Sequence, residues 1–182
     1  MNASTFLAAL ALPALLFALP AEAAGKFPTT VKAGADTLVL NGKGMREATV
    51  FKVDVYEGAL YLKKKSSNAT VILKTDAPWS LKMNFVRDVK KGKLTSAWSD
   101  GFKNNAGGKG QTGLKKLNSW MGNIKDGQSM SFTYVPGVGT EVRFAGKVKG
   151  TIKGADFGRA LLSVWLGKTP PSKRLKKGLL GK

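Results

Sequence analysis

The side chains that could do chemistry in this chain are limited in kind, because its 182 residues include neither cysteine nor histidine. Their absence removes thiol nucleophiles, imidazole general bases, disulfides, haem ligation through histidine and zinc sites of the Cys/His type. Acid–base chemistry would therefore have to use Asp, Glu, Lys, Tyr or water. We predict no metal site and no organic cofactor, and the composition argues against the usual hydrolytic mechanisms.

Positive charge is the dominant electrostatic feature. Thirty Lys and Arg against 11 Asp and Glu give a formal charge of +19, which predicts affinity for an anionic partner. The spacing of Lys147, Lys149 and Lys153 predicts a row on the outer side of one strand, which Arg143 and Lys82 could join from other strands. Such a row suits anionic lipid at an envelope surface, and a plain solvated face is the alternative. Nucleic acid is not expected, because no strand combines aromatic and basic residues into a base-stacking platform.

The first 23 residues have the pattern of a cleaved secretory signal peptide. An uncharged apolar run from Phe6 to Leu19 is followed by the small residues Ala21 and Ala23, which stand where a signal peptidase cleaves. The run is shorter than the roughly 20 residues of a membrane-spanning helix, although an uncleaved anchor is the alternative. We therefore predict export to the periplasm or beyond, and one mature domain over residues 24–182.

The elements that must position a site follow the order strands, helices, strands, helices. Alternating apolar residues and apolar runs predict strands at 37–40, 51–62, 71–73, 79–85, 129–134, 140–144 and 147–152. Apolar residues at helical spacing predict helices at 94–102, 114–124, 156–167 and 173–180, with Asp156 as an N-cap and Gly167 as the end of the third. Asn41-Gly42-Lys43-Gly44 is expected to be a turn. The order is typical of an α+β domain with an antiparallel sheet.

Three stretches carry a more specific signal. They are the segment from Leu40 to Leu62, with Gly42-Lys43-Gly44-Met45-Arg46 at its start, the segment Phe85-Val86-Arg87-Asp88-Val89, and the C-terminal segment from Phe157 to Gly181. From about Thr37 onward they resemble the chalcone isomerase-like proteins, in particular the exported bacterial branch. The resemblance implies an open-faced β-sandwich, in which helices cover one side of a large antiparallel sheet and a ligand cleft lies between them. It also favours a Gram-negative periplasm.

The resemblance implies a set of candidate site residues. The arginine that meets the ligand's anionic oxygen falls on Arg46, and the family's catalytic threonine falls on Tyr56. The catalytic tyrosine, its partner asparagine and the threonine of the C-terminal helix fall on Trp98, Asn105 and Val164. Trp98 has no phenol and Val164 has no polar atom, whereas the isomerase reaction needs donors around a ketone that gains negative charge.

These replacements imply a cleft more apolar than that of an isomerase. We therefore predict an exported, monomeric, non-catalytic binding protein that holds a small apolar or amphiphilic anion, such as a fatty acid or a phenolic, with Arg46 at the head group. The predicted cleft lining is Arg46, Tyr56, Trp98, Phe102, Asn105 and Val164. One alternative is an isomerase of the family's intramolecular-lyase type, with Arg46, Tyr56 and Asn105 as catalytic residues. The other is a basic surface module built on the Lys147 row.

Overall fold

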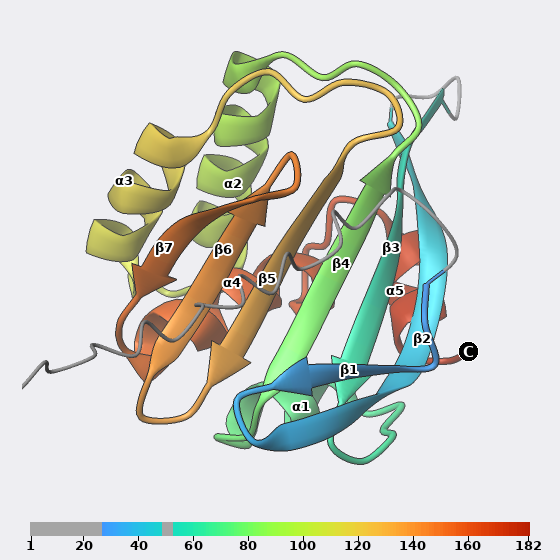
Figure 1. Ribbon diagram of the computed structural model, residues 1–182, viewed down its shortest axis with the longest axis vertical. Helices are drawn as coiled ribbons and strands as arrows, with labels where there is room; N and C mark the ends of the chain where they lie inside the picture. The colour runs from blue at the N-terminus through green and yellow to red at the C-terminus, as the bar shows by residue number, and fades with distance from the viewer. Residues whose placement is uncertain (1–26, 49–52) are drawn as a thin grey trace, which may run out of the picture.

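One seven-stranded antiparallel sheet organises the molecule (Figure 1). The structure is a computed structural model that describes residues 27–48 and 53–182, so the predicted signal peptide and Phe51 of a predicted strand lie outside the described residues. Each strand pairs with the next along the chain: β1 (Thr30–Ala33), β2 (Asp36–Ala48), β3 (Val53–Leu62), β4 (Trp79–Phe85), β5 (Ser129–Val135), β6 (Gly139–Phe144) and β7 (Lys147–Ile152). None of the helices in the described ranges is long and apolar enough to cross a membrane.

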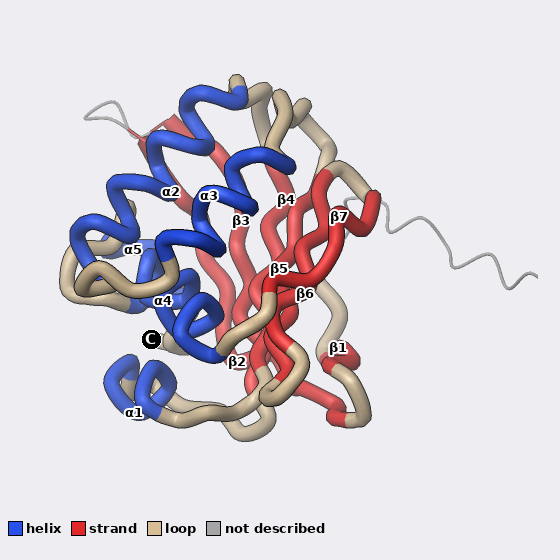
Figure 2. The backbone as a smooth tube through the Cα atoms, turned by 90° about the vertical axis from the view of Figure 1, so that its left-hand side faces the viewer, coloured by secondary structure: helices blue, strands red, loops and turns tan. Residues whose placement is uncertain are grey.

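The helices cover one face of this sheet, and β1 lies on the other (Figure 2). They are α1 (Ala69–Lys74), α2 (Lys91–Asn105), α3 (Gln111–Trp120), α4 (Ala155–Leu166) and α5 (Lys173–Leu179). In β4 the alternation predicted from the sequence explains the one-sided cover, since Trp79, Leu81, Met83 and Phe85 all belong to the main core. The predicted α+β class and the open-faced sandwich are confirmed.

Helix α4 is the centre of the helical layer. Its buried residues run all around its axis: Phe157, Gly158, Ala160, Leu161, Leu162, Ser163, Val164, Trp165 and Leu166. Neighbouring elements approach it closely, and at Gly101 of α2 an added Cβ would lie only 2.6 Å from Cγ1 of Val164. Gly167 ends α4 as predicted, but the N-cap residue is Gly154, and Asp156 lies in the first turn.

The predicted turn at Asn41-Gly42-Lys43-Gly44 is wrong, because these residues continue β2 past a bulge at Asn41. The glycines serve close packing instead. A Cβ on Gly42 would clash with the carbonyl oxygen of Gly178, so the backbone of α5 rests directly on β2. The buried Asn41 side chain fixes this contact by donating from Nδ2 to the carbonyl of Leu179 at 2.7 Å.

The strand predicted at 71–73 is also wrong, since this apolar run lies in helix α1. A short apolar run does not distinguish strand from helix by its period. The decisive local feature is Asn68, whose Oδ1 accepts from the backbone amides of Thr70 at 3.0 Å and Val71 at 3.2 Å. This is an N-cap, which stabilises a helix start by about 1 kcal/mol.

A second, smaller core lies on the face of the sheet that the helices leave open. Figure 1 shows β1 crossing in front of the sheet, where it buries Ala33, Leu38, Ala59 and Tyr61 against one another. The Tyr61 hydroxyl donates to the carbonyl of Pro28 at 3.0 Å. The β1–β2 hairpin therefore shields part of this face from solvent.

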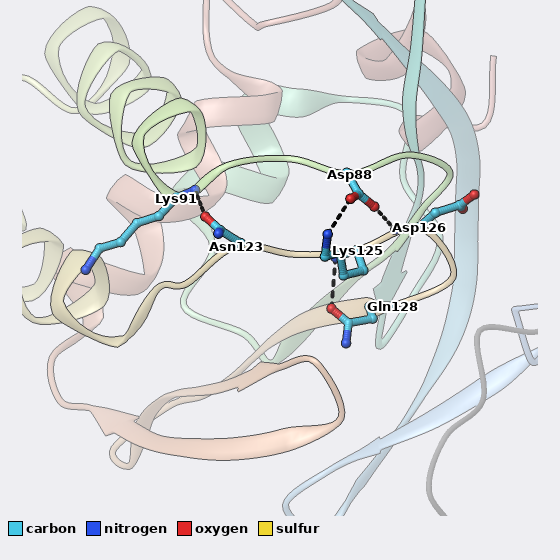
Figure 3. Close-up of polar contacts among 6 residues, drawn as sticks. All are labelled: Asp88, Lys91, Asn123, Lys125, Asp126 and Gln128. Carbon is cyan, nitrogen blue, oxygen red and sulfur yellow. Dashed lines mark hydrogen bonds and ion pairs between the residues drawn. The ribbon is translucent and has the colours of Figure 1, made fainter.

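The loop between β4 and α2, residues 86–90, is held in place by the segment that precedes β5 (Figure 3). Val89 and Ile124 exchange two backbone hydrogen bonds, of 2.8 and 2.9 Å. The Asp88 carboxylate accepts from Lys125 Nζ at 2.6 Å and from the Asp126 amide at 3.0 Å. These bonds lower the pKa of Asp88. Helix α3 ends at Trp120, short of the predicted 124, which frees Ile124 for this contact.

We predict that Gly101→Ala destabilises the protein, and that the sign of its effect reverses when Val164 is also changed to Ala. The new methyl group overpacks against Val164, which costs about 1–3 kcal/mol, against a gain of about 1 kcal/mol in helix propensity. In the Val164→Ala background the overpacking is relieved, and only the gain in helix propensity remains. Chemical denaturation of the four proteins of this cycle measures the coupling, and equal effects of Gly101→Ala in both backgrounds would contradict the contact.

We predict that Asp88→Asn lowers the melting temperature near neutral pH. Because the pKa of folded Asp88 is lowered, its stabilising effect is complete above the unfolded value of about 3.9 and disappears as the pH falls through the lower folded value. The difference in melting temperature between the two proteins should shrink over that acidic range. Asp100→Asn, which removes the same charge from an exposed position of α2, is the matched control and should show no such trend.

Candidate ligand-binding cleft

A cleft of about 620 Å³ opens between the helical layer and the β2–β4 side of the sheet. This volume lies within the usual range for a small-molecule site, about 300–1,000 Å³. Apolar side chains from the sheet, the loop after β4, α2 and α4 form one part of its lining: Val55, Phe85, Val89, Leu94, Ala97, Trp98, Val164 and Trp165. The other part is charged and consists of Arg46, Glu47, Arg87, Asp88, Lys90 and Lys93. The cleft thus combines a long apolar wall with a cationic side.

Arg46 and Tyr56 are cross-strand neighbours in this cleft. They are paired residues of β2 and β3 and therefore point to the same face of the sheet. The Arg46 guanidinium carbon lies 5.8 Å from the centre of the Tyr56 ring, a cation–π contact that holds the half-buried side chain over the aromatic face. The structure therefore brings together Arg46, which the resemblance placed at the ligand's anionic oxygen, and Tyr56, which stands where the family has its catalytic threonine.

The hydroxyl of Tyr56 is fixed by a residue that the sequence did not indicate. Trp165 of α4 donates from Nε1 to this hydroxyl at 2.8 Å. Burial raises the pKa of Tyr56, although the nearby Arg46 and the Trp165 bond both oppose the shift. The phenol is therefore protonated at neutral pH. Because its oxygen accepts from Trp165, its own proton is available for a ligand oxygen, and no described residue accepts it.

Trp98 forms the junction between α2, α4 and the sheet. Its ring meets the rings of Phe132 and Trp165 edge to face, at centroid distances of 5.8 and 5.4 Å. It lines the cleft but is only 3% exposed, and its Nε1–H has no acceptor in the described part of the chain. Such an unpaired buried donor costs free energy, and protein atoms enclose this nitrogen.

Two of the six predicted lining residues lie outside the cleft lining. Phe102 is fully buried and packs against Phe157, with the ring centres 6.0 Å apart. Asn105, at the end of α2, exchanges two hydrogen bonds of 2.9 Å with the backbone of Thr169. It lines a separate hollow of about 370 Å³. The other four predicted residues line the cleft, namely Arg46, Tyr56, Trp98 and Val164.

Three cations of the cleft were not among the predicted site residues. Arg87 precedes Asp88 in the loop after β4, Lys90 is the N-cap residue of α2, and Lys93 lies in its first turn. The available signal was the charge run from Arg87 to Lys93, which composition alone assigns to a loop or the end of an element. Its relevance depends on the pairing of Val89 with Ile124, which the sequence does not reveal.

The predicted basic row does not assemble as expected. Lys147 pairs with the core residue Phe144, and Lys149 Nζ lies 6.0 Å from the centre of the Phe144 ring, so both lie on the helix side at the sheet edge. Arg143 of β6 and Lys82 of β4 are the two cross-strand partners of Ser131 in β5. All three side chains face the open side of the sheet. The prediction that Arg143 and Lys82 join the row is wrong, because the two groups occupy opposite faces.

A second hollow of about 620 Å³ lies on the open face beneath β1. Its lining mixes aliphatic, charged and hydroxyl side chains, and the hydroxyls of Ser80 and Thr133 are hydrogen-bonded to each other at 2.9 Å. Three cations line it, Lys32, Lys82 and Arg143, and Arg143 is paired with Glu141 at 2.8 Å. This hollow has no aromatic wall, so the cleft on the helix side is the better candidate for an amphiphile.

Comparisons with known proteins agree with this geometry. A family model described as chalcone isomerase-like matches residues 21–181. The crystal structure of a fatty-acid binding protein from Arabidopsis thaliana is similar, with a TM-score of 0.68, 17% sequence identity, and coverage of 85% of this chain and 90% of that one. At this identity the similarity shows the shared fold. No curated protein matches the sequence significantly. The resemblance predicted from the sequence is confirmed, and the chain belongs to the chalcone isomerase-like family.

Proposed function

We propose that this protein is a non-catalytic binding protein that holds a single-chain amphiphilic anion, such as a fatty acid, in the cleft on the helix side. The observation that carries the proposal is the pairing of Arg46 with Tyr56 at an apolar wall. A guanidinium can hold a carboxylate through two parallel hydrogen bonds, and the neutral Tyr56 phenol can donate a third. The similar fold of a protein named for fatty-acid binding supports the same ligand class.

The same geometry argues for binding and against turnover. Intramolecular addition to an enone requires donors around the ketone oxygen and a group that positions the nucleophile. In this cleft Val164 has no polar atom, and Asn105 is engaged with the backbone of Thr169 elsewhere. Arg46 and Tyr56 remain beside the anionic head group of the ligand, and together they suffice to hold an oxyanion.

We expect Arg46→Ala to weaken palmitate binding by about tenfold to a hundredfold, because hydrogen bonds to charged groups contribute about 1.5–3 kcal/mol each. Tyr56→Phe removes one such bond and should weaken binding by about tenfold. Isothermal titration calorimetry of the purified protein with palmitate measures both effects.

Matched controls exist on the opposite face of the sheet. Arg143→Ala removes the same charge there, and Tyr61→Phe removes a hydroxyl from the same strand as Tyr56. Neither should change palmitate affinity. If Arg46→Ala bound palmitate as tightly as the parent protein, the head-group assignment would be wrong.

The proposal includes export, which the pattern of residues 1–23 supports. When the full chain is expressed in a Gram-negative host, we expect the protein in the periplasmic fraction to have the mass of residues 24–182. Native mass spectrometry of the same sample also reveals any amphiphile that is purified with it. A protein that retains residues 1–23 in the membrane fraction would favour an uncleaved anchor.

A further inference from the structure

The cleft carries more positive charge than one carboxylate requires. Arg46, Arg87, Lys90 and Lys93 all line it, and none forms an ion pair with a carboxylate in the described ranges. A fatty acid carries one negative charge, which Arg46 alone can hold in a bidentate manner. The remaining three cations, Arg87, Lys90 and Lys93, are exposed residues of the lining that a single carboxylate does not require.

The two acidic residues of the lining do not neutralise these cations, because each is engaged elsewhere. Glu47 is paired with Arg174 of α5. Asp88 is bound to Lys125 and to the Asp126 amide, so its carboxylate is directed to the segment before β5 (Figure 3). Asp54, the cross-strand neighbour of Glu47, is exposed and does not line the cleft.

Hydrogen bonds hold the backbone of Arg87, Lys90 and Lys93 in place. Arg87 lies between Val86, whose amide donates to the carbonyl of Val55 at 3.1 Å, and the anchored Asp88. Two residues after Arg87, the Val89 amide donates to the carbonyl of Ile124. At the start of α2, the Lys91 amide donates to Asn123 Oδ1 at 2.9 Å. We call Arg87, Lys90 and Lys93 the rim cations.

We propose that the preferred ligand of the cleft is a single-chain amphiphile with a phosphate monoester head group, recognised by Arg46 and Tyr56 together with the rim cations. This inference rests on the proposed function, because it assigns a ligand class to the same cleft. A phosphate monoester carries about −1.5 to −2 charges at neutral pH and presents three strong acceptor oxygens. It therefore matches several cations and neutral donors at once, whereas a carboxylate matches one arginine.

The test compares three ligands of equal chain length, namely palmitate, hexadecyl phosphate and hexadecyl sulfate, each below its critical micelle concentration. The rim variant combines Arg87→Gln, Lys90→Gln and Lys93→Gln. Its control combines Lys147→Gln, Lys149→Gln and Lys153→Gln, which removes the same net charge from residues that do not line the cleft. Calorimetric titration at about pH 8 and low salt gives the nine affinities of the parent and the two variants.

We expect the parent to bind hexadecyl phosphate about tenfold more tightly than palmitate, the combined effect of several partly exposed ion pairs. The rim variant should lose that preference, because its affinity for hexadecyl phosphate falls by a larger factor than its affinity for palmitate, and the control should resemble the parent. Equal affinity of the parent for phosphate and palmitate would overturn the inference and leave the proposed function intact. An equal loss in the control would also overturn it, because the preference would then come from the net charge. If none of the three ligands bound, the proposed function itself would fail.

Acidity provides a second, independent readout. The phosphate loses its second charge as the pH falls below its second pKa of about 6, whereas the sulfate keeps one charge throughout. The chain has no histidine, the side chain whose charge ordinarily changes between pH 5 and 8. The nearest acids are Glu47 and Asp88, and the pKa of Asp88 is lowered further from this range. The preference of the parent for phosphate over sulfate should therefore disappear by about pH 5, and a preference that persisted there would overturn the role of charge.

Discussion

The burial of α4 on every side from Ala160 to Leu166 is the constraint from which the rest of the helical layer follows. A helix that is apolar all around its axis has to be enclosed by close neighbours, and here glycines permit the approach. Gly101 of α2 faces Val164, Gly113 of α3 faces the Phe157 ring, and Gly158 of α4 itself faces Tyr134. Because α4 lies so deep, Trp165 reaches the strand residue Tyr56 and orients its hydroxyl. The apolar packing of the core thus sets the direction of a polar group in the cleft.

The electrostatics of the cleft depend on where the acidic side chains are directed. In a chain with a formal charge of +19, acids are the scarce residues. Glu47 and Asp88 both lie in the cleft lining, yet one is paired with α5 and the other with the segment before β5. These contacts stabilise the scaffold and at the same time leave Arg46 and the rim cations without a counter-ion among residues 27–48 and 53–182. A ligand anion can therefore supply the negative charge that these cations lack.

Much of the fold could be predicted from the sequence, because the sheet residues alternate and the C-terminal helix has clear spacing. The failures have a common cause. The Asn41–Gly44 segment has the local chemistry of a turn, but contact with α5 over 130 residues away keeps it in a strand. Phe102 and Asn105 follow Trp98 at helical spacing. This indicates that the three side chains share one face of the helix, but not that they lie at the same level along its axis. With a rise of about 1.5 Å per residue, Asn105 lies about 10 Å further along the helix than Trp98, next to Thr169.

The contact between Asn41 and Leu179 also bears on the order in which the chain folds. All seven strands pair with their neighbours in sequence, so the sheet can grow in the order in which residues leave the ribosome. The α5–β2 contact is different, since it joins Asn41 and Leu179, which lie 138 positions apart in the sequence. Its packing needs both Gly42 and Gly178 in place. The native state is therefore completed only once α5 has been made and packs on β2, and until then the surface of β2 that α5 covers stays exposed.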